Sequence, residues 1–375
     1  MDVLCVGRNG LLMMRRFIAI AFLFATSQAW AAFGYYSPIS VNSAQVPSTQ
    51  TDFPVLVSVT DARFKTVANS GHVQNANGYD IRPYTSSALS SAITGYELER
   101  YNATTGEVVM WVKVSSLSSS TTPIYLAYGD SGISTDGSST TTWSNSFLGV
   151  YHLKDGTTLN VNSSTGSNNG TNHSVTATTG QIDGAGGFVS ASSQYVDLST
   201  GIAPTAITIS AWVNATSFPN AANAVVVRNN ASNANAFLFV KSNGKLNCGC
   251  VATNQRQYDG TGSHTLSSST WYYLTLSYDS SAGLIGYVNA ASDGTVAANG
   301  TMNTGAANTN IGRDPTAGTL LWNGKIDEAR VAGVARSADW ITTEYNNQSA
   351  PGTFETLGTE VAVTTGASGW FYFFP

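Results

Sequence analysis

Charged side chains are scarce in this chain of 375 residues, since Lys, Arg, Asp and Glu together account for only 10% of it. The formal net charge is −5, and no basic cluster occurs, which excludes the electrostatic patch that nucleic-acid binding requires. Gly, Ser, Thr, Asn and Ala take the place of charges, as is typical of exported all-β proteins with many turns. Hydrophobic residues make up 42%, which is enough for a core and excludes global disorder.

Cysteine is rare as well, with three residues in the whole chain, so a disulfide framework is excluded. Cys5 lies in a segment that we expect to be removed. Cys248 and Cys250 are two apart on a predicted strand and therefore face the same side. We interpret them as two small hydrophobic residues on one strand face. A bridge between them is the alternative, although it would strain the backbone. A metal site there lacks further ligands.

One apolar run stands near the N-terminus, and it is short. Residues 17–25 follow the positive group Met14-Arg15-Arg16, and Ala29-Trp30-Ala31 is a small-x-small cleavage site. This pattern predicts a signal peptide over residues 1–31 and a secreted or cell-surface protein. The run is too short for a comfortable transmembrane helix, so we expect no integral membrane segment after signal removal; a retained anchor is the alternative.

Short strands at regular spacing, without a helical pattern, predict a β-sandwich over residues 32–130. Residues 96–101, for example, alternate apolar and charged side chains, as a half-buried strand does. This region resembles a bacterial extracellular module catalogued as domain of unknown function 2341. The stretches that carry the resemblance are residues 53–57, 78–82, 109–114 and 124–129. That family has no established activity, so the resemblance implies a fold only. Residues 131–142 are rich in Ser, Gly and Thr and are interpreted as a linker.

A second domain is expected over residues 143–361, where residues 207–213 and 271–278 alternate as strands do. Near its end stands the motif G-x-I-D-E-x-R-V, residues 324–331. These pieces, in this order, resemble the laminin-G-like domains, which are concanavalin A-like jelly rolls. The resemblance implies two stacked antiparallel sheets. The predicted fold class is therefore all-β, with two β-sandwich domains of which the second is a concanavalin A-like jelly roll. Ser337 is expected to cap a one-turn helix after the motif.

The same resemblance implies one structural calcium ion, which in laminin-G-like domains commonly ties a polar turn to the closing strand. The matching positions are the side chains of Asn162 and Asp327, with backbone carbonyls near Asn168 and Gly184. Asn162 stands where relatives tend to carry an acid, so we expect weak binding or an empty site. Asp327 and Glu328 are neighbours on a strand and face opposite ways. The alternative is therefore that one of them is a buried carboxylate held by backbone N–H groups.

A catalytic constellation is missing. Glucanases of this fold carry an acidic-x-acidic-x-x-acidic strand whose carboxylates share one cleft, and no such strand occurs here. Glu97 and Glu99 are two apart, but they lie in the first domain, on a strand face that we expect to be exposed. Asp327 and Glu328 are adjacent and cannot converge. The four histidines are scattered, and no serine sits in a nucleophile elbow. The sequence thus predicts a protein that is not an enzyme, and a glycoside hydrolase is the least favoured alternative.

Recognition is the remaining chemistry. Carbohydrate binders use flat aromatic rings for sugar faces and amide or charged groups for hydroxyls. The candidates in predicted loops are Tyr258, Arg313, Asp314 and Trp322, and for each a packing role is the alternative. We predict an exported, non-catalytic protein that binds a glycan or cell-surface polymer through its jelly roll. The alternative is a structural or adhesive surface or fibre component that makes protein–protein contacts.

The last segment, residues 362–375, contains five consecutive aromatic residues at positions 370–374. Exposing so many aromatic side chains at a chain end is costly. We therefore expect this tail to dock. It either mediates self-association with another subunit or packs as a terminal strand on its own domain.

Overall fold

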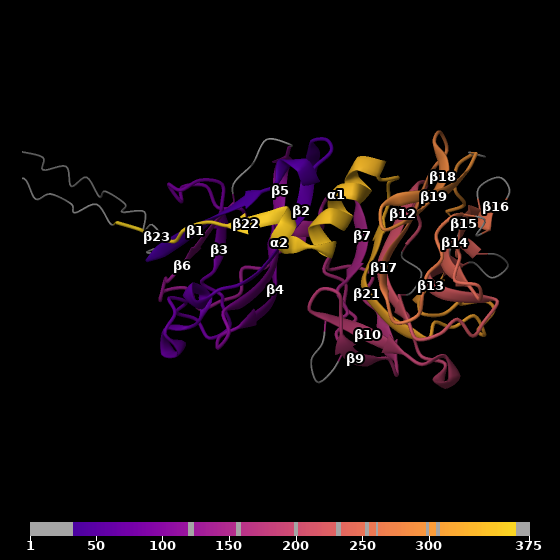
Figure 1. Ribbon diagram of the computed structural model, residues 1–375, viewed down its shortest axis with the longest axis horizontal. Coiled ribbons are helices and arrows are strands. Elements are labelled where there is room, and N and C mark those ends of the chain that lie inside the picture. Colours follow the sequence, from indigo (N-terminus) through magenta and orange to yellow (C-terminus); the bar gives the residue numbers. More distant parts are fainter. Residues whose placement is uncertain are drawn as a thin grey trace, which may run out of the picture.

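Two β-sandwiches lie side by side along the long axis of the computed structural model (Figure 1). The structure describes residues 33–118, 124–154, 159–198, 202–229, 234–251, 255–259, 262–297, 300–304 and 308–364. The predicted signal peptide, residues 1–31, and the aromatic residues of the tail lie outside these ranges. No helix within them is long and apolar enough to span a membrane.

The first sandwich pairs a five-stranded sheet with a three-stranded one. Its strands are β1 (Tyr35–Val41), β2 (Gln50–Thr60), β3 (Arg82–Tyr84), β4 (Tyr96–Asn102), β5 (Glu107–Leu117), β6 (Ile124–Tyr128), β22 (Glu355–Leu357) and β23 (Val361–Ala362). The orders are β22-β1-β6-β3, with β23 also on β1, and β2-β5-β4. Alternation along β5 sends Met110 and Val112 into the core between these sheets. It sends Val109 and Trp111 to the outer side, where they pack with Trp143.

Short 3₁₀ helices punctuate the connections, and each is a single turn. They are η1 (Ser43–Gln45), η2 (Ala62–Phe64), η3 (Val67–Asn69), η4 (Thr140–Trp143) and η5 (Ser190–Ser192). The turn η4 falls at the end of the expected linker and delivers Trp143 to the boundary between the sandwiches.

The second sandwich is larger and pairs an eight-stranded with a seven-stranded antiparallel sheet. The eight strands are β7 (Phe147–Tyr151), β9 (Thr176–Thr179), β10 (Gly184–Phe188), β12 (Ile207–Ala215), β17 (Trp271–Asp279), β18 (Gly283–Val288), β19 (Ala291–Val296) and β21 (Gly324–Ala332). The seven are β8 (Thr171–His173), β11 (Tyr195–Asp197), β13 (Ala222–Asn229), β14 (Ala234–Lys241), β15 (Leu246–Val251), β16 (Gln255–Asp259) and β20 (Asn308–Ile311). Their orders are β19-β18-β17-β12-β21-β10-β9, with β7 also on β21, and β16-β15-β14-β13-β20-β11-β8.

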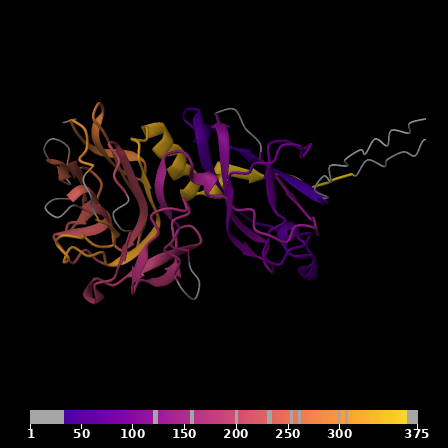
Figure 2. The ribbon, with the colours of Figure 1, turned by 180° about the vertical axis from the view of Figure 1, so that it is seen from behind.

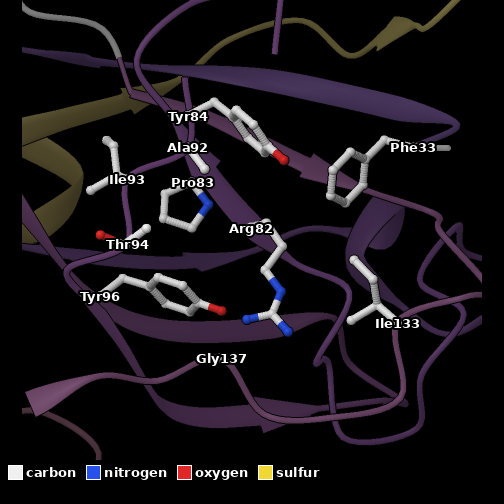
Figure 3. Close-up of a pocket in the computed structure, with 10 residues that line it drawn as sticks. All are labelled: Phe33, Arg82, Pro83, Tyr84, Ala92, Ile93, Thr94, Tyr96, Ile133 and Gly137. Atoms are coloured by element: carbon white, nitrogen blue, oxygen red, sulfur yellow. The ribbon is translucent and has the colours of Figure 1, made fainter. Parts of the chain in front are cut away.

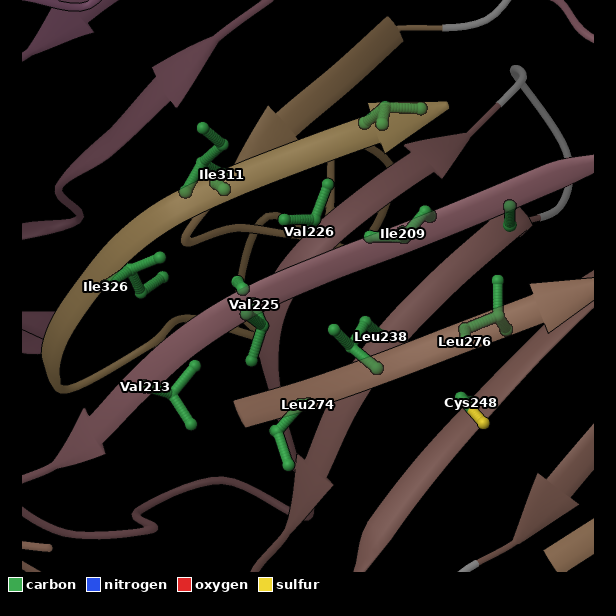
Figure 4. Close-up of a cluster of buried hydrophobic side chains, with 14 of the residues drawn as sticks. Ile209, Val213, Val225, Val226, Leu238, Cys248, Leu274, Leu276, Ile311 and Ile326 are labelled. Atoms are coloured by element: carbon green, nitrogen blue, oxygen red, sulfur yellow. The ribbon is translucent and has the colours of Figure 1, made fainter. Parts of the chain in front are cut away.

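One apolar core fills the space between these two sheets (Figure 4). Ile209 and Val213 of β12 face Leu238 of the opposite sheet, as the predicted alternation requires. Cys248 and Cys250 are both free and buried in this core. Their interpretation as small hydrophobic residues on one strand face is confirmed.

The chain leaves the second sandwich after β21 and returns to the first. Ser337 caps helix α1 (Ala338–Ser349) by accepting a hydrogen bond from the Trp340 N–H at 3.2 Å, as predicted, but the helix has 12 residues rather than one turn. Helix α2 (Pro351–Phe354) and strands β22 and β23 follow, and both strands pair with β1. Trp340 and Phe354 are buried in the core of the first sandwich. Figure 2 shows this segment in yellow, running from one sandwich to the other.

This return corrects the expected jelly-roll range of 143–361. The predicted edge strand after residue 354 exists, but it belongs to the first sandwich. Asn347 of α1 holds the connection, since its side-chain amide donates to the Leu56 carbonyl at 2.9 Å and accepts from the Leu56 N–H at 2.7 Å. Asn347 thus pairs one N–H and one carbonyl on the free edge of β2, where the backbone has no neighbouring strand.

Glu355, at the start of β22, predicts a pH dependence of stability. Its carboxyl is buried, with Oε1 accepting from the Ser58 N–H at 2.9 Å and Oε2 without a partner in the described residues. Burial raises the pKa of Glu355 from 4.5 to about 8. The folded protein therefore holds a proton that the unfolded chain releases at about pH 4.5. The free energy of unfolding should fall as pH rises from about 4.5 to 8.

Glu355→Gln should remove this part of the pH dependence, because the amide keeps the acceptor for Ser58 and cannot ionise. At pH 5 we expect the free energy of unfolding of the variant to match that of the parent within about 1 kcal/mol. At pH 9 we expect it to exceed that of the parent by on the order of a few kcal/mol. Urea unfolding at the two pH values measures the difference. Parallel pH profiles for the two proteins would contradict it.

Candidate functional site

The boundary between the sandwiches gathers carboxylates from both around one imidazole. His152 follows β7, and its Nδ1 lies 2.6 Å from Glu328 Oε1 of β21, while its Nε2 lies 3.3 Å from Glu97 Oε2 of β4. Glu99 Oε2 is 3.5 Å from the same Nδ1. The side chains of Glu99 and Glu328 are 1% and 0% exposed. The expectation that Glu97 and Glu99 lie on an exposed face is therefore wrong, because β4 faces the second sandwich.

Two β-bulges produce this convergence. On β4 the pairing with β5 shifts between Leu98 and Arg100, at Glu99. On β21 the pairing with β12 shifts across the segment that contains Glu328, whose φ is +50°. A bulge adds one residue to one strand and turns its side chain off the regular alternation. Both Asp327 and Glu328 are consequently buried, although strict alternation predicts opposite directions.

Arg330 completes the cluster on the side of the helix α1. Its Nη2 lies 2.6 Å from Glu328 Oε2, and its Nη1 lies 2.6 Å from Glu344 Oε1 of α1. The guanidinium carbon is 4.3 Å from the ring centre of Trp111 and 5.0 Å from that of Trp143. Arg330 thus joins β21, the helix and the aromatic residues of the boundary through charge-assisted hydrogen bonds and cation–π contacts.

The two tryptophans also bind the acids. Trp111 Nε1 donates to Glu99 Oε2 at 2.6 Å, and Trp143 Nε1 donates to Glu97 Oε2 at 2.7 Å. Ser164 adds a hydrogen bond to Glu97 Oε1 at 2.8 Å. The buried carboxylates of this cluster therefore accept hydrogen bonds from neighbouring side chains, as buried polar groups require.

The charges decide what this cluster can do. Burial alone would lower the pKa of His152, but Glu328, Glu99 and Glu97 raise it well above its usual value. Burial raises the pKa of Glu97, but the charge on His152 outweighs it and brings that pKa to about 2. Burial raises the pKa of Glu99 to about 7. With its pKa raised in this way, His152 would have to give up a proton before one of its nitrogens could ligate a metal.

Glu99, His152 and Glu328 are nevertheless a group within the described ranges whose ligand atoms are close enough for a metal ion. Besides the charge on His152, the Glu99 oxygen that faces the group already accepts from Trp111, and Glu328 already binds Arg330. These residues do not fit a metal. They form an ion-pair network that holds the two sandwiches together.

Asp327 and Asn168, which are expected to hold calcium, make hydrogen bonds within the protein. Asp327 Oδ2 accepts hydrogen bonds from the backbone N–H groups of Gln181 and Ile182, at 2.8 and 2.9 Å. These N–H groups occupy Oδ2, whereas the buried Oδ1 has no hydrogen-bond partner in the described residues. The Asn162 side chain is exposed, and the Asn168 carbonyl accepts from a tyrosine hydroxyl. The carboxylate held by backbone N–H groups is the alternative that the sequence left open.

Two of the predicted ligand-binding residues lie inside the second sandwich. Tyr258 is 6% exposed on β16, and its hydroxyl donates to the Asp293 carbonyl at 2.6 Å. Trp322 is 0% exposed, and its Nε1 donates to the Lys325 carbonyl at 3.2 Å. Neither ring faces solvent, so the expectation that they contact a ligand is corrected in favour of packing. Asp314 is also buried and accepts from the N–H of Thr316 at 2.8 Å, which stabilises a turn.

Arg313 is the predicted site residue that lies at the surface, on the outer face of the seven-stranded sheet. Its guanidinium carbon is 3.7 Å from the ring centre of Tyr195 on β11. His173 of β8 stacks on Tyr195 as well, with ring centres 4.1 Å apart and planes inclined by 5°. All three side chains are partly exposed. We call His173, Tyr195 and Arg313 the stacked triad.

Next to the stacked triad, the same outer face carries an amide and an apolar strip that are both buried. Ile311 of β20 points into the core, so its neighbour Asn310 points outward, and Asn310 Oδ1 has no hydrogen-bond partner in the described residues. Beyond it, Phe237 and Phe239 lie two apart on β14, with ring centres 4.9 Å apart. Sequence analysis missed His173, Tyr195 and Asn310. Alternation could have placed Tyr195 outward, but only the register of β8 on β11 pairs it with His173.

The opposite outer face, on the eight-stranded sheet, is covered. Helix α1 packs on it through Ile341 and Tyr345, which contact Trp212 and Tyr273. Trp212 Nε1 also donates to Gln348 Oε1 of the helix at 2.8 Å. Figure 1 shows β13, β14 and β15 at the end of the molecule away from the first sandwich. The outer face that carries the stacked triad is thus the one left open by the module contact.

Several known structures are similar to this chain at low identity and with TM-scores below 0.5. Domain 4 of AbnA, a GH43 extracellular arabinanase from Geobacillus stearothermophilus in complex with arabinotriose, is 18% identical, with a TM-score of 0.43 over 52% of this chain and 96% of that one. A Ruminococcus gnavus IT-sialidase CBM40 bound to α2,3 sialyllactose is 18% identical, with a TM-score of 0.34 over 38% and 84%. The heptameric SAP-like pentraxin from Limulus polyphemus is 16% identical, with a TM-score of 0.33 over 40% and 73%.

Sequence families match both sandwiches, whereas no curated protein matches the chain. Residues 77–167 match the domain of unknown function DUF2341, and residues 183–342 match Laminin_G_3 of the concanavalin A-like lectin/glucanases superfamily. The first match extends through β7, which pairs with β21 of the second sandwich. The chain therefore combines a DUF2341 module with a laminin-G-like domain of the concanavalin A-like superfamily that follows it.

Proposed function

We propose that this protein is an exported, non-catalytic glycan-binding protein and that the stacked triad is part of its binding surface. The observation that carries the proposal is that His173, Tyr195 and Arg313 are partly exposed and stacked on the outer sheet face that the module contact leaves open. Export rests on the signal-peptide pattern of residues 1–31.

The chemistry of this face suits a sugar. A guanidinium held over a tyrosine ring is preorganised, so little side-chain entropy is lost when it binds hydroxyl groups. The imidazole of His173 adds a flat ring against which the C–H face of a sugar can pack.

The absence of catalysis rests on where the carboxylates lie. The acids that converge are Glu97, Glu99 and Glu328, and they surround the imidazolium of His152 at the module boundary. A glycosidase needs one carboxyl to donate a proton and another to act on the sugar, both at an open cleft. Here Glu328 and Glu97 are held ionised by His152, and Glu328 is fully buried.

The test is binding of the purified protein to an array of neutral and acidic glycans. Arg313→Ala should weaken binding about tenfold or more, since a hydrogen bond to a charged group contributes about 1.5–3 kcal/mol. His173→Ala should weaken binding as well, because it removes the ring that stacks on Tyr195. Lys241→Ala is the matched control, because Lys241 is a partly exposed cation at the end of β14 that pairs with the exposed Asp259. It should bind as the parent does.

Three results would overturn the proposal. One is that no glycan on the array binds. A second is that both triad variants bind as tightly as the parent. A third is that the bound glycan is shortened on prolonged incubation, which would make the protein a hydrolase. Absence of glycan binding together with a stable oligomer in sedimentation would favour the structural or adhesive alternative.

A further inference from the structure

A hollow in the first sandwich lies where its two sheets part. It occupies about 260 Å³ between the edge strands β3 and β4, and the chain that leads to the second sandwich closes one side of it. Arg82 and Tyr84 of β3 and Tyr96 of β4 line it, together with Phe33 and Ile133 (Figure 3). The volume equals that of roughly nine water molecules at about 30 Å³ each. A ligand of monosaccharide size or smaller fits such a space.

Arg82 brings a positive charge into this hollow, and Asp136 and Asp80 lie near enough to act on it through their charges. Its guanidinium makes one hydrogen bond, from Nη2 to the Thr135 carbonyl at 2.7 Å, and no ion pair with a described residue. The nearby acids have other partners. Asp80 accepts from three backbone N–H groups, and Asp136 accepts from the N–H of Ser138. A half-buried guanidinium offers up to five N–H donors, of which most are unused here.

Tyr96 adds a second unused donor. Its side chain is 95% buried, being 5% exposed, and its hydroxyl has no hydrogen-bond partner in the described part of the chain. Figure 3 shows this hydroxyl pointing toward the guanidinium of Arg82. A buried hydroxyl without a partner costs free energy, which a bound acceptor would recover.

Gly137 lets the backbone pack directly against these two groups, so it forms one wall of the hollow. A side chain at this position would collide with Arg82 Nη1 and Tyr96 Oη. The remaining walls are apolar, with the rings of Phe33 and Tyr84 edge to face at 5.6 Å between centres. One side of the hollow therefore carries the charge of Arg82, and the other side is formed by the flat rings of Phe33 and Tyr84.

We propose that this hollow is a binding site for a small ring-shaped carboxylate, such as a uronic acid. The two oxygens of a carboxylate match the planar fork of Arg82, and the hydroxyl of Tyr96 donates to one of them. The rings of Phe33 and Tyr84 pack against the body of the ligand. A phosphate dianion is less suited, because one guanidinium and one hydroxyl leave part of its charge unpaired. The site lies on the DUF2341 module and does not depend on the stacked triad.

The test is titration calorimetry of the full chain with glucuronate, benzoate and glucose. Glucuronate and benzoate share the carboxylate and differ in the ring, so the tighter of the two identifies a sugar acid or another organic acid as the ligand. Glucose has the ring without the charge and should not bind at the same concentration. Arg82→Met should weaken binding at least a hundredfold, and Tyr96→Phe about tenfold. Lys113→Met, which removes a cation of the same module outside the hollow, should bind as the parent does.

Binding of neither acid at 10 mM would overturn the proposal, as would equal binding of glucose. Unchanged affinity in Arg82→Met would do the same. If that variant melts early, Tyr96→Phe decides, since it removes a single oxygen that has no hydrogen-bond partner among the described residues. An unchanged affinity for the acids in Tyr96→Phe would then refute the site. Loss of glycan-array binding in Arg313→Ala with intact acid binding would show that the two sites are separate.

Discussion

Arg330→Ala should destabilise the protein by about 3–5 kcal/mol, because it leaves buried acids without their cation. Arg330 is 2% exposed and pairs with Glu328 and Glu344, whose side chains are 0% and 4% exposed. The loss also removes the cation–π contacts with Trp111 and Trp143. Since these residues come from both sandwiches and from α1, we expect calorimetry to show a single transition for the parent and two for the variant.

The matched control is an ion pair at the surface. Lys241 and Asp259 are 3.1 Å apart with side chains 31% and 59% exposed, and such pairs contribute only about 0.2–1 kcal/mol. Lys241→Ala should therefore leave the melting curve nearly unchanged. A loss below about 1 kcal/mol in Arg330→Ala would show that the boundary network contributes little, as some buried ion pairs do.

Trp322→Ala should cost about 3–5 kcal/mol of stability without acting on glycan binding itself. Trp322 is fully buried in the core of the second sandwich, next to Phe218 at 6.4 Å between ring centres. Its removal leaves a cavity and takes one hydrogen-bond donor from the Lys325 carbonyl. Urea unfolding measures the loss of stability.

Arg313→Ala is the contrasting variant, nine positions earlier on the same connection and partly exposed. It should change stability by less than about 1 kcal/mol, because surface substitutions rarely do more. It should, however, weaken glycan binding. If Trp322→Phe folds stably yet loses glycan binding, Trp322 contacts the ligand after all, and the assignment of its ring to packing is refuted.

Periodicity and composition were sufficient for the fold class. Strict alternation in residues 207–213 predicted β12, and the G-x-I-D-E motif marked β21, because a strand with one buried face must repeat every two residues. The same rule placed Cys248 and Cys250 on one buried face. Scarcity of charge and abundance of turn residues pointed to sandwiches before any strand was located.

The candidate sites depended on contacts that periodicity cannot predict. A bulge at Glu99 and another at Glu328 break the two-residue repeat, and the acids they redirect meet His152 only because the two sandwiches touch there. His173 stacks on Tyr195 because β8 pairs with β11 in a register that places the two residues opposite each other, which the sequence pattern does not reveal.

The sequence by itself thus determined that this protein is built of β-sandwiches, and which residues alternate into their cores. The tertiary structure decided where the modules end, since β22 returns to β1 across more than three hundred residues of chain. It also decided which polar groups are buried without partners, such as the hydroxyl of Tyr96 beside Arg82. The physical reason is range: alternation follows from the geometry of neighbouring residues, whereas burial and pairing of charge follow from segments that are distant in the chain.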